Sequence, residues 1–125
     1  MKKAKILIID DMPELLKGFG MILEDAGYEV VTASTYEEGK QQANESHPDL
    51  LLVDIRLGEY NGLQLVAREH AGQHRPVIVM SGHPDPYLEE EARRLGAEYV
   101  AKPVAPGELL ALIKKALLAR RAMPH

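Results

Sequence analysis

The run from Leu50 to Val53 is apolar at four consecutive positions and leads directly into one acid, Asp54. Successive side chains of a strand point to opposite faces, so an uninterrupted apolar run predicts a strand that is buried on both faces. Strands of this kind belong to parallel sheets that helices cover on both sides. Asp54 then lies at the carboxyl end of a buried strand, which is where open α/β sheets bind their ligands.

The rest of the chain repeats the pattern of a short strand followed by a helix. Strands are predicted over residues 6–9, 29–33, 50–53, 76–80 and 98–101. A helix is predicted after each strand, although the one after residues 29–33 contains Gly39 and few apolar residues, and Pro13, Pro86 and Pro106 suit the first turns of three of the helices. Five such units predict an α/β domain over residues 1–125, with three α/β/α layers and a five-stranded parallel sheet. The periodicity alone does not determine the order of the strands.

Charge and composition exclude several classes of function. The chain carries 15 basic and 19 acidic residues, a net charge of −4, which argues against direct binding of nucleic acid by this domain. The absence of cysteine excludes disulfides and thiolate metal sites. No apolar run approaches the roughly 20 residues that span a bilayer, and the N-terminus lacks the apolar region of a signal peptide. We therefore expect a cytoplasmic domain that does not contact a membrane.

Polar side chains follow four of the five predicted strands. They are Asp10, Asp11, Asp54, Ser81 and Lys102. Taken singly, each has an ordinary explanation as a helix cap, a turn residue or a solvated charge. The carboxyl ends of parallel strands meet at one edge of a sheet, so all of these groups are expected to lie close together. That coincidence favours a functional site.

The chemistry of these groups favours phosphoryl transfer. Three close carboxylates repel one another, and a hard divalent cation such as Mg²⁺ relieves the repulsion because it prefers oxygen ligands. Mg²⁺ held by few carboxylates keeps positions for phosphate oxygens, which a hydroxyl and an ammonium group would also contact. A carboxylate can act as the nucleophile in such a transfer and form an aspartyl phosphate.

Four segments together carry a resemblance to a known family. They are IIDD at 8–11, LLLVDIRLGEYNGL at 50–63, VIVMSG at 77–82 and YVAKP at 99–103. With this combination the chain resembles the receiver domain of two-component response regulators. The resemblance implies a flavodoxin-like fold with strand order 2-1-3-4-5. It also implies a signalling switch in a phosphorelay rather than an enzyme, in which the phosphoacceptor assists its own phosphorylation and dephosphorylation.

The resemblance assigns the metal and the phosphate to particular residues. It implies that Asp54 accepts phosphate from the phosphohistidine of a histidine kinase. Asp11 and Asp54 correspond to direct Mg²⁺ ligands, together with the main-chain carbonyl of Arg56, and Asp10 acts through water. Lys102 corresponds to the lysine that pairs with the phosphoryl group.

The remaining assignments concern the switch and the lifetime of the phosphate. Ser81 corresponds to the switch hydroxyl that contacts the phosphoryl group, and Tyr99 to the aromatic residue that turns inward on activation. Arg56 and His83 fall at positions that tune phosphate lifetime in the family. The chain departs from the family at Leu57-Gly58, where Met-Pro is common, and this should loosen the loop after Asp54.

The resemblance implies two kinds of partner. A sensor histidine kinase or a phosphotransfer protein would supply the phosphate. An output domain or downstream partner would contact the face formed by the helix after Pro86, strand 98–101 and the last helix. A second copy of the chain is a further candidate for this face, because Leu110 and Leu118 lie off the apolar stripe of the last helix.

Two other functions compete with this interpretation. A Mg²⁺-dependent phosphatase of the haloacid dehalogenase type uses similar groups, but its nucleophile follows the first strand in a D-x-D arrangement. Here Asp10-Asp11 is followed by Met12 and Pro13. A flavodoxin-type cofactor binder would need a loop rich in Gly, Ser and Thr after the first strand, and this chain has none there.

Overall fold

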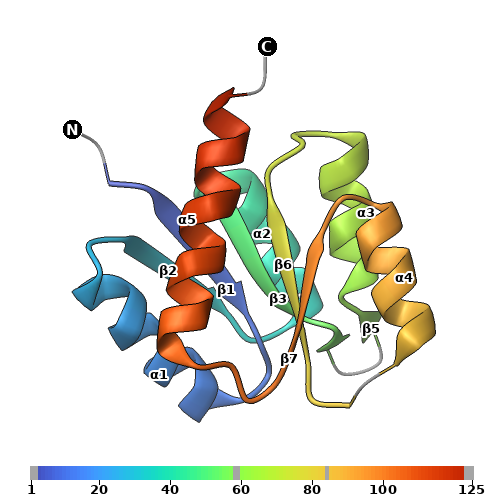
Figure 1. Ribbon diagram of the computed structural model, residues 1–125, viewed down its shortest axis with the longest axis horizontal. Helices are drawn as coiled ribbons and strands as arrows, with labels where there is room; N and C mark the ends of the chain where they lie inside the picture. Colours follow the sequence, from blue (N-terminus) through green and yellow to red (C-terminus); the bar gives the residue numbers. More distant parts are fainter. Residues whose placement is uncertain (1–2, 58–59, 84, 123–125) are drawn as a thin grey trace.

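A computed structural model describes residues 3–57, 60–83 and 85–122 of the chain. The strands are β1 (Lys5–Ile9), β2 (Glu29–Ala33), β3 (Leu50–Asp54), β4 (Arg56–Leu57), β5 (Tyr60–Asn61), β6 (Val77–Ser81) and β7 (Glu98–Ala101). The helices are α1 (Pro13–Asp25), α2 (Tyr36–Glu45), α3 (Leu63–Ala71), α4 (Pro86–Arg94) and α5 (Pro106–Ala122). The predicted alternation of strand and helix is confirmed, apart from the two short strands β4 and β5 between β3 and α3 (Figure 1).

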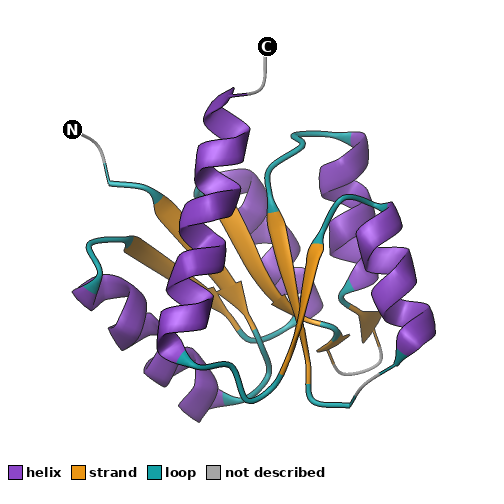
Figure 2. Cartoon of the chain, viewed as in Figure 1, coloured by secondary structure: helices purple, strands orange, loops and turns teal. Residues whose placement is uncertain are grey.

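The main sheet has five parallel strands in the order β2-β1-β3-β6-β7. Numbered in chain order, these five strands follow the expected order 2-1-3-4-5, and β4 and β5 lie outside the sheet. α1 and α5 cover one face of the sheet, whereas α2, α3 and α4 cover the other, which gives three layers (Figures 1 and 2). The predicted fold class is therefore confirmed.

The buried strand β3 separates two hydrophobic cores. All five of its residues are buried, and they alternate between the faces, with Leu50 and Leu52 on one side and Leu51 and Val53 on the other. The core beneath α1 and α5 is formed by Ile6, Ile8, Leu23, Leu50, Leu52, Ile78, Met80, Val100, Val104, Leu109 and Ile113. The core beneath α2, α3 and α4 is formed by Leu7, Ile9, Ala33, Ala43, Leu51, Val53, Ile55, Leu57, Leu65, Val66, Val77, Val79, Ala92, Ala97 and Tyr99.

Local signals in the sequence explain where two of the helices begin. Thr35 Oγ1 accepts a hydrogen bond from the backbone N–H of Glu38 (3.0 Å) and so caps α2. Asp85 Oδ1 accepts from the N–H groups of Tyr87 (3.1 Å) and Leu88 (3.3 Å) at the start of α4. These side chains satisfy backbone donors that have no partner within the first turn of a helix.

Two features differ from the expectation. β4 and β5 form a small antiparallel ribbon directly after β3, where only a loop was expected, and Gly58 lies outside the described residues. Leu110 is half-buried against the core beneath α1 and α5, so it lies nearer the apolar stripe of α5 than its spacing indicated. Leu118 is 54% exposed, as expected. The apolar stripe of α5 is thus wider than its spacing suggested.

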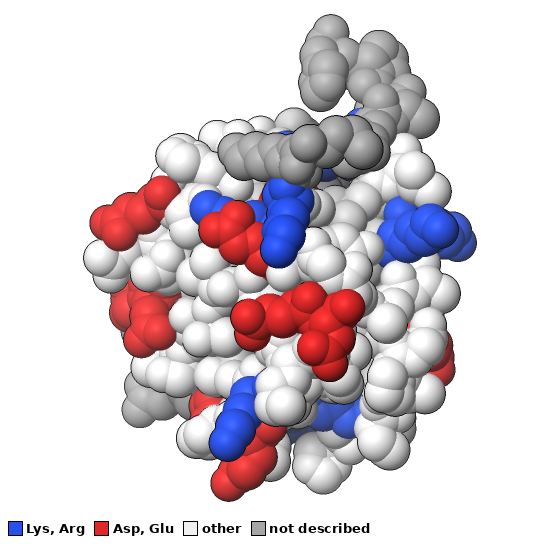
Figure 3. All heavy atoms as spheres, turned by 90° about the vertical axis from the view of Figure 1, so that its left-hand side faces the viewer, with Lys and Arg blue, Asp and Glu red and all other residues white. Residues whose placement is uncertain are grey.

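The surface is mixed in charge. On the face drawn in Figure 3, acidic and basic side chains of the described residues are interspersed. Within the described part of the chain, none of the helices has the length and apolar content needed to cross a membrane.

Candidate functional site

The structure brings together the acids that follow β1 with the acid that ends β3. One carboxylate oxygen from each of Asp10, Asp11 and Asp54 lies within 4.8 Å of the others. Asp10 is fully buried and Asp54 is 7% exposed, whereas Asp11 is exposed to solvent. β1 and β3 are adjacent parallel strands, so the acids at their carboxyl ends lie close together. These ends are at the lower edge of the sheet in Figure 1.

Lys102 follows β7 and reaches across to the two buried carboxylates. Its Nζ donates a hydrogen bond to Asp10 Oδ2 (2.9 Å) and lies 3.5 Å from Asp54 Oδ2. The other oxygen of Asp10, Oδ1, accepts from the backbone N–H of Met12 (2.9 Å). Charge-assisted hydrogen bonds of this kind are stronger than neutral ones, and they fix Asp10 in the site.

The end of β3 lies in direct backbone contact with the start of α3. Gly62 N–H donates to the carbonyl of Ile55 (2.6 Å). A Cβ atom at position 62 would overlap the carbonyl oxygen of Asp54 and lie 2.9 Å from Val53 Cγ1. Only glycine leaves room for this approach. The Asn61-Gly62 pair predicts a loop, but it does not reveal that Gly62 touches the backbone of Asp54.

Burial raises the pKa of the Asp54 carboxyl above its usual value, because loss of hydration disfavours the charged form. The backbone N–H of Arg56, which donates to Asp54 Oδ1 (3.3 Å), opposes this change. The negative charges of Asp10 and Asp11 add to it, and the ammonium of Lys102 reduces it. Asp54 is therefore an anion held in an unfavourable environment, which a bound cation would relieve.

We expect Asp54→Asn to be more stable than the wild type near neutral pH. The pKa of Asp54 is higher in the folded state than in the unfolded state. At pH values between these two pKa values, the folded state therefore binds more protons than the unfolded state. The free energy of unfolding of the wild type then falls as pH rises through that window. Each pKa unit corresponds to about 1.4 kcal/mol. Urea unfolding in metal-free buffer should show the advantage of Asp54→Asn near pH 7 and its loss near pH 4, roughly the unperturbed value. An equal advantage at both pH values would contradict the account.

The hydroxyl of Ser81 is engaged within its own turn. Its Oγ donates to the carbonyl of His83 (2.6 Å) and accepts from the N–H of His83 (3.3 Å). Ser81 ends β6 and is buried, but these hydrogen bonds direct the hydroxyl to His83 rather than to the acidic cluster. Arg56 and His83 both have exposed side chains beside the site.

Tyr99 already points into the protein. It is 8% exposed and belongs to the core beneath α2, α3 and α4. Its hydroxyl is buried and has no hydrogen-bond partner among the described residues. An unsatisfied buried hydroxyl costs about 1–3 kcal/mol, so the inward position of Tyr99 carries an energetic penalty.

Replacement of Tyr99 by phenylalanine should therefore increase stability. Removing the unsatisfied hydroxyl while keeping the ring is expected to raise the free energy of unfolding by about 1 kcal/mol. Tyr87→Phe is a matched control, because Tyr87 is 69% exposed and its hydroxyl is expected to contribute nothing. Urea unfolding of both variants measures the difference, and a loss of stability in Tyr99→Phe would show that the hydroxyl has a partner in solution.

The donor set suits a hard divalent cation. Asp10, Asp11 and Asp54 offer only oxygen ligands, and Asp54 is destabilised as an anion by burial. Mg²⁺ and Ca²⁺ prefer such ligands, whereas Zn²⁺ sites usually contain histidine or cysteine. The residues present thus fit a hard divalent cation such as Mg²⁺.

Comparison with known proteins identifies the same family. The family model of the response regulator receiver domain matches residues 6–114. The transcriptional regulatory protein KdpE of Mycobacterium tuberculosis is 34% identical over 113 residues, which are 90% of this chain and 50% of KdpE. The two-component response regulator PprB of Pseudomonas aeruginosa is 40% identical over 112 residues, or 84% of this chain and 40% of PprB. The chain thus spans half or less of the length of these relatives.

Solved structures agree with this result over nearly the whole chain. A CheY-like receiver domain from Methanospirillum hungatei has a TM-score of 0.91 and 31% identity, covering 96% of this chain and 98% of that domain. A receiver domain from Clostridium thermocellum has a TM-score of 0.86 and 31% identity, covering 94% and 97% of the two chains. The chain therefore belongs to the family of receiver domains of two-component response regulators.

Proposed function

We propose that Asp54 is the phosphoacceptor of a two-component phosphorelay, receiving its phosphoryl group from a phosphohistidine with the help of Mg²⁺. The donor would be a sensor histidine kinase or a phosphotransfer protein. The observation that supports this best is the meeting of Asp10, Asp11 and Asp54 with the ammonium of Lys102 at one sheet edge. Carboxylates, a cation site and a lysine are what transfer to an aspartate requires.

Each residue of the site would have a separate role in the transfer. An Asp54 carboxylate oxygen forms a bond to phosphorus as the P–N bond of the phosphohistidine breaks. Asp11, Asp54 and the main-chain carbonyl of Arg56 would hold Mg²⁺ directly, and Asp10 would hold it through water. When bound, Mg²⁺ offsets negative charge on the transferred group. The ammonium of Lys102 already lies 3.5 Å from Asp54, where it can pair with the phosphoryl oxygens.

The switch would begin at Ser81. Its hydroxyl must leave the carbonyl of His83 to contact a phosphoryl group on Asp54. That movement would alter the loop between β6 and α4 and so the face formed by α4, β7 and α5, which includes Tyr99. A ligand shifts such an equilibrium only by binding one state better, and the phosphoryl group would do so through Ser81 and Lys102. An output domain, a downstream protein or a second copy of the chain would contact this face.

Beryllofluoride, a noncovalent mimic of the phosphoryl group, tests the switch. Amide hydrogen exchange with Mg²⁺ and beryllofluoride should change protection in the β6–α4 loop and in α4 and β7 of the wild type. Asp54→Asn should show no such change, because it lacks the carboxylate on which the mimic is held. An identical exchange pattern with and without beryllofluoride in the wild type would contradict the proposed switch.

Arg56 is proposed to lengthen the life of the aspartyl phosphate. The backbone N–H of Arg56 donates to Asp54, and the Arg56 side chain is exposed. The guanidinium is therefore close enough to Asp54 to shield the acyl phosphate from water. Arg56→Ala should lose phosphate several-fold faster than the wild type in a time course of phosphoprotein mass. Arg68→Ala removes an exposed arginine from α3 and serves as the control. An unchanged rate in Arg56→Ala would refute this role.

The competing functions gain no support. A haloacid dehalogenase-type phosphatase would place its nucleophile after β1, whereas the acid that ends the central buried strand here is Asp54. The domain match and the solved structures point to regulators rather than to metabolic enzymes. We further propose that the receiver domain extends over residues 1–125, acts in the cytoplasm and binds no nucleic acid itself.

A further inference from the structure

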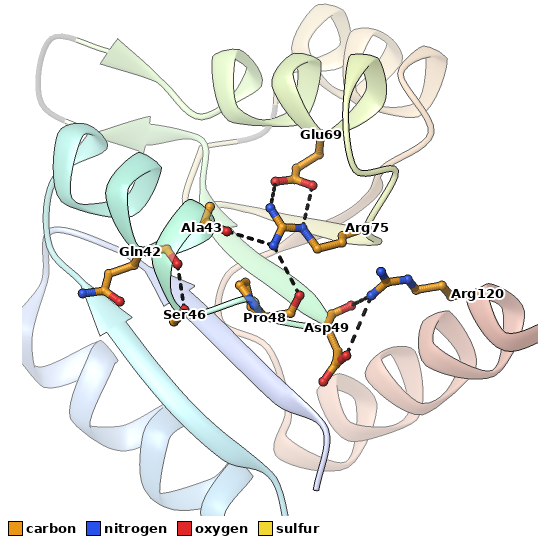
Figure 4. Close-up of polar contacts among 8 residues, drawn as sticks. All are labelled: Gln42, Ala43, Ser46, Pro48, Asp49, Glu69, Arg75 and Arg120. Atoms are coloured by element: carbon orange, nitrogen blue, oxygen red, sulfur yellow. Dashed lines mark hydrogen bonds and ion pairs between the residues drawn. The ribbon is translucent and has the colours of Figure 1, made fainter. Parts of the chain in front are cut away.

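A buried ion pair lies at the sheet edge opposite the acidic cluster. Arg75 and Glu69 are 7% and 6% exposed and are joined by two parallel hydrogen bonds, Nε to Oε2 (2.9 Å) and Nη2 to Oε1 (2.6 Å) (Figure 4). Burying two charges costs several kcal/mol per ion before their attraction offsets it. Such a pair therefore contributes little net stability by itself. Its main effect is to hold the segments that carry Glu69 and Arg75 in a fixed geometry.

The same guanidinium holds two further segments. Arg75 Nη1 donates to the carbonyl of Ala43 (2.9 Å), near the C-terminal end of α2, and lies 3.5 Å from the carbonyl of Pro48, just before β3. Arg75 lies just before β6. The pairing of β6 with β3 begins next to it, where the N–H of Leu51 donates to the carbonyl of Pro76. Glu69 is thus tied, through Arg75, to α2 and to the starts of β3 and β6 (Figure 4).

α3 connects this ion pair to the phosphoacceptor. Glu69 lies near its C-terminal end, and Gly62 immediately precedes its first residue. A nine-residue helix is a rod of about 13 Å, so a shift at one end moves the other. Gly62 has little space to absorb such a shift, because its N–H binds the carbonyl of Ile55 and even a Cβ atom added there would overlap the carbonyl oxygen of Asp54.

The segment that Gly62 touches carries two functional groups. The backbone N–H of Arg56 donates to Asp54 Oδ1, and the carbonyl of Arg56 is a proposed metal ligand. Gly62 N–H also binds the carbonyl of Ile55, the residue between them. Any axial displacement of α3 therefore moves the peptide groups that orient Asp54 and the proposed metal ligand.

We propose that Glu69 and Arg75 are positioning residues for the metal and phosphoacceptor site, acting through α3 and Gly62. This inference rests on the proposed function, since it assumes that the acidic cluster binds a divalent cation. The pair does not touch the cation. It fixes the axial position of α3, and α3 fixes the backbone from Asp54 to Arg56.

The test compares metal binding in folded proteins. The variant Glu69→Met/Arg75→Met replaces both partners by unbranched apolar side chains, so that neither charge is left buried and unpaired. Glu37→Met/Lys40→Met is the matched control, because it removes an exposed ion pair from α2 with the same change in charges. Circular dichroism first shows that each variant is folded and unfolds cooperatively on heating. Each folded protein is then titrated with Mn²⁺, a paramagnetic substitute for Mg²⁺, and binding is followed by water-proton relaxation.

We expect the Glu69/Arg75 variant to bind Mn²⁺ about tenfold more weakly than the wild type, the loss typical when groups that orient metal ligands are removed. The control should bind as the wild type does. Equal affinity in a folded Glu69/Arg75 variant would overturn the inference and leave the proposed function intact. No binding by the wild type would overturn the proposed function, and this inference with it.

A second variant keeps the test decisive if the double substitution does not fold. Arg75→Lys retains the charge beside Glu69 but cannot make two parallel hydrogen bonds together with the one to Ala43. It should weaken Mn²⁺ binding and increase amide exchange at Ile55, Arg56 and Gly62. Wild-type affinity and exchange in Arg75→Lys would contradict the positioning role.

Discussion

Replacing Gly62 with alanine is expected to destabilise the protein and to impair phosphorylation of Asp54. The added Cβ would overlap the carbonyl oxygen of Asp54 and lie 3.1 Å from the α-carbon of Ile55. Neither atom belongs to a flexible side chain, so either β3 or α3 must move. Overpacking of this kind costs about 1–3 kcal/mol. The movement would also displace the carboxylate from Lys102, so the rate of phosphorylation should fall more than the loss of stability explains.

Gly18→Ala is the matched control for this prediction. Gly18 lies in the middle of α1, where a new Cβ would meet no atom within 4 Å. Alanine favours a helix over glycine by about 1 kcal/mol, so this variant should be slightly more stable than the wild type. Urea unfolding and phosphorylation by acetyl phosphate should thus separate the two substitutions. Wild-type stability and rate in Gly62→Ala would show that β3 and α3 do not touch in solution as the structure describes.

Removal of Glu69 alone should cause the largest loss of stability of any single side chain considered. In Glu69→Ala the guanidinium of Arg75 stays buried without its carboxylate, and breaking a buried pair in this way costs about 3–5 kcal/mol. Domains of this size are stable by only about 5–15 kcal/mol, so the variant should be marginal. Its melting temperature should fall by more than roughly 10 °C.

Two comparisons isolate the unpaired charge as the cause. Glu69→Met/Arg75→Met should recover part of the lost stability, because no buried charge is then left unpaired, although the carbonyl of Ala43 still loses its donor. Glu91→Ala removes a carboxylate that bonds Arg94 at 2.7 Å on the solvent-facing side of α4, where solvent weakens such a pair, so its loss should be much smaller. Thermal unfolding followed by circular dichroism gives all three values. A loss in Glu69→Ala no greater than that in Glu91→Ala would contradict the burial of the pair.

Most of the fold could be predicted because its signals are local. Continuous apolar runs marked the buried strands, and Pro13, Pro86 and Pro106 marked the first turns of α1, α4 and α5. The meeting of the acids with Lys102 followed from one rule, that parallel strands end at the same edge of the sheet. The strand order came from the resemblance to a family, because periodicity does not encode which strands are neighbours.

Other features depend on contacts that spacing does not report. The hydroxyl of Ser81 binds His83, and Gly62 touches the backbone of Asp54, only because the loops after β6 and β3 take particular paths. The Glu69–Arg75 pair, in contrast, has a signal in the sequence. Glu69 lies four and three residues after the buried Leu65 and Val66, so it shares their face of α3. An acid on an apolar face predicts a buried cationic partner.

The role of Asp54 as phosphoacceptor is tested most directly by the mass of the intact protein after treatment with acetyl phosphate and Mg²⁺. We expect the wild type to gain one phosphoryl group, chelation of Mg²⁺ to prevent the gain, and Asp54→Asn to gain none. A wild type that never takes up phosphate, or an Asp54→Asn variant that takes it up equally, would contradict the assignment of Asp54 as the phosphoacceptor.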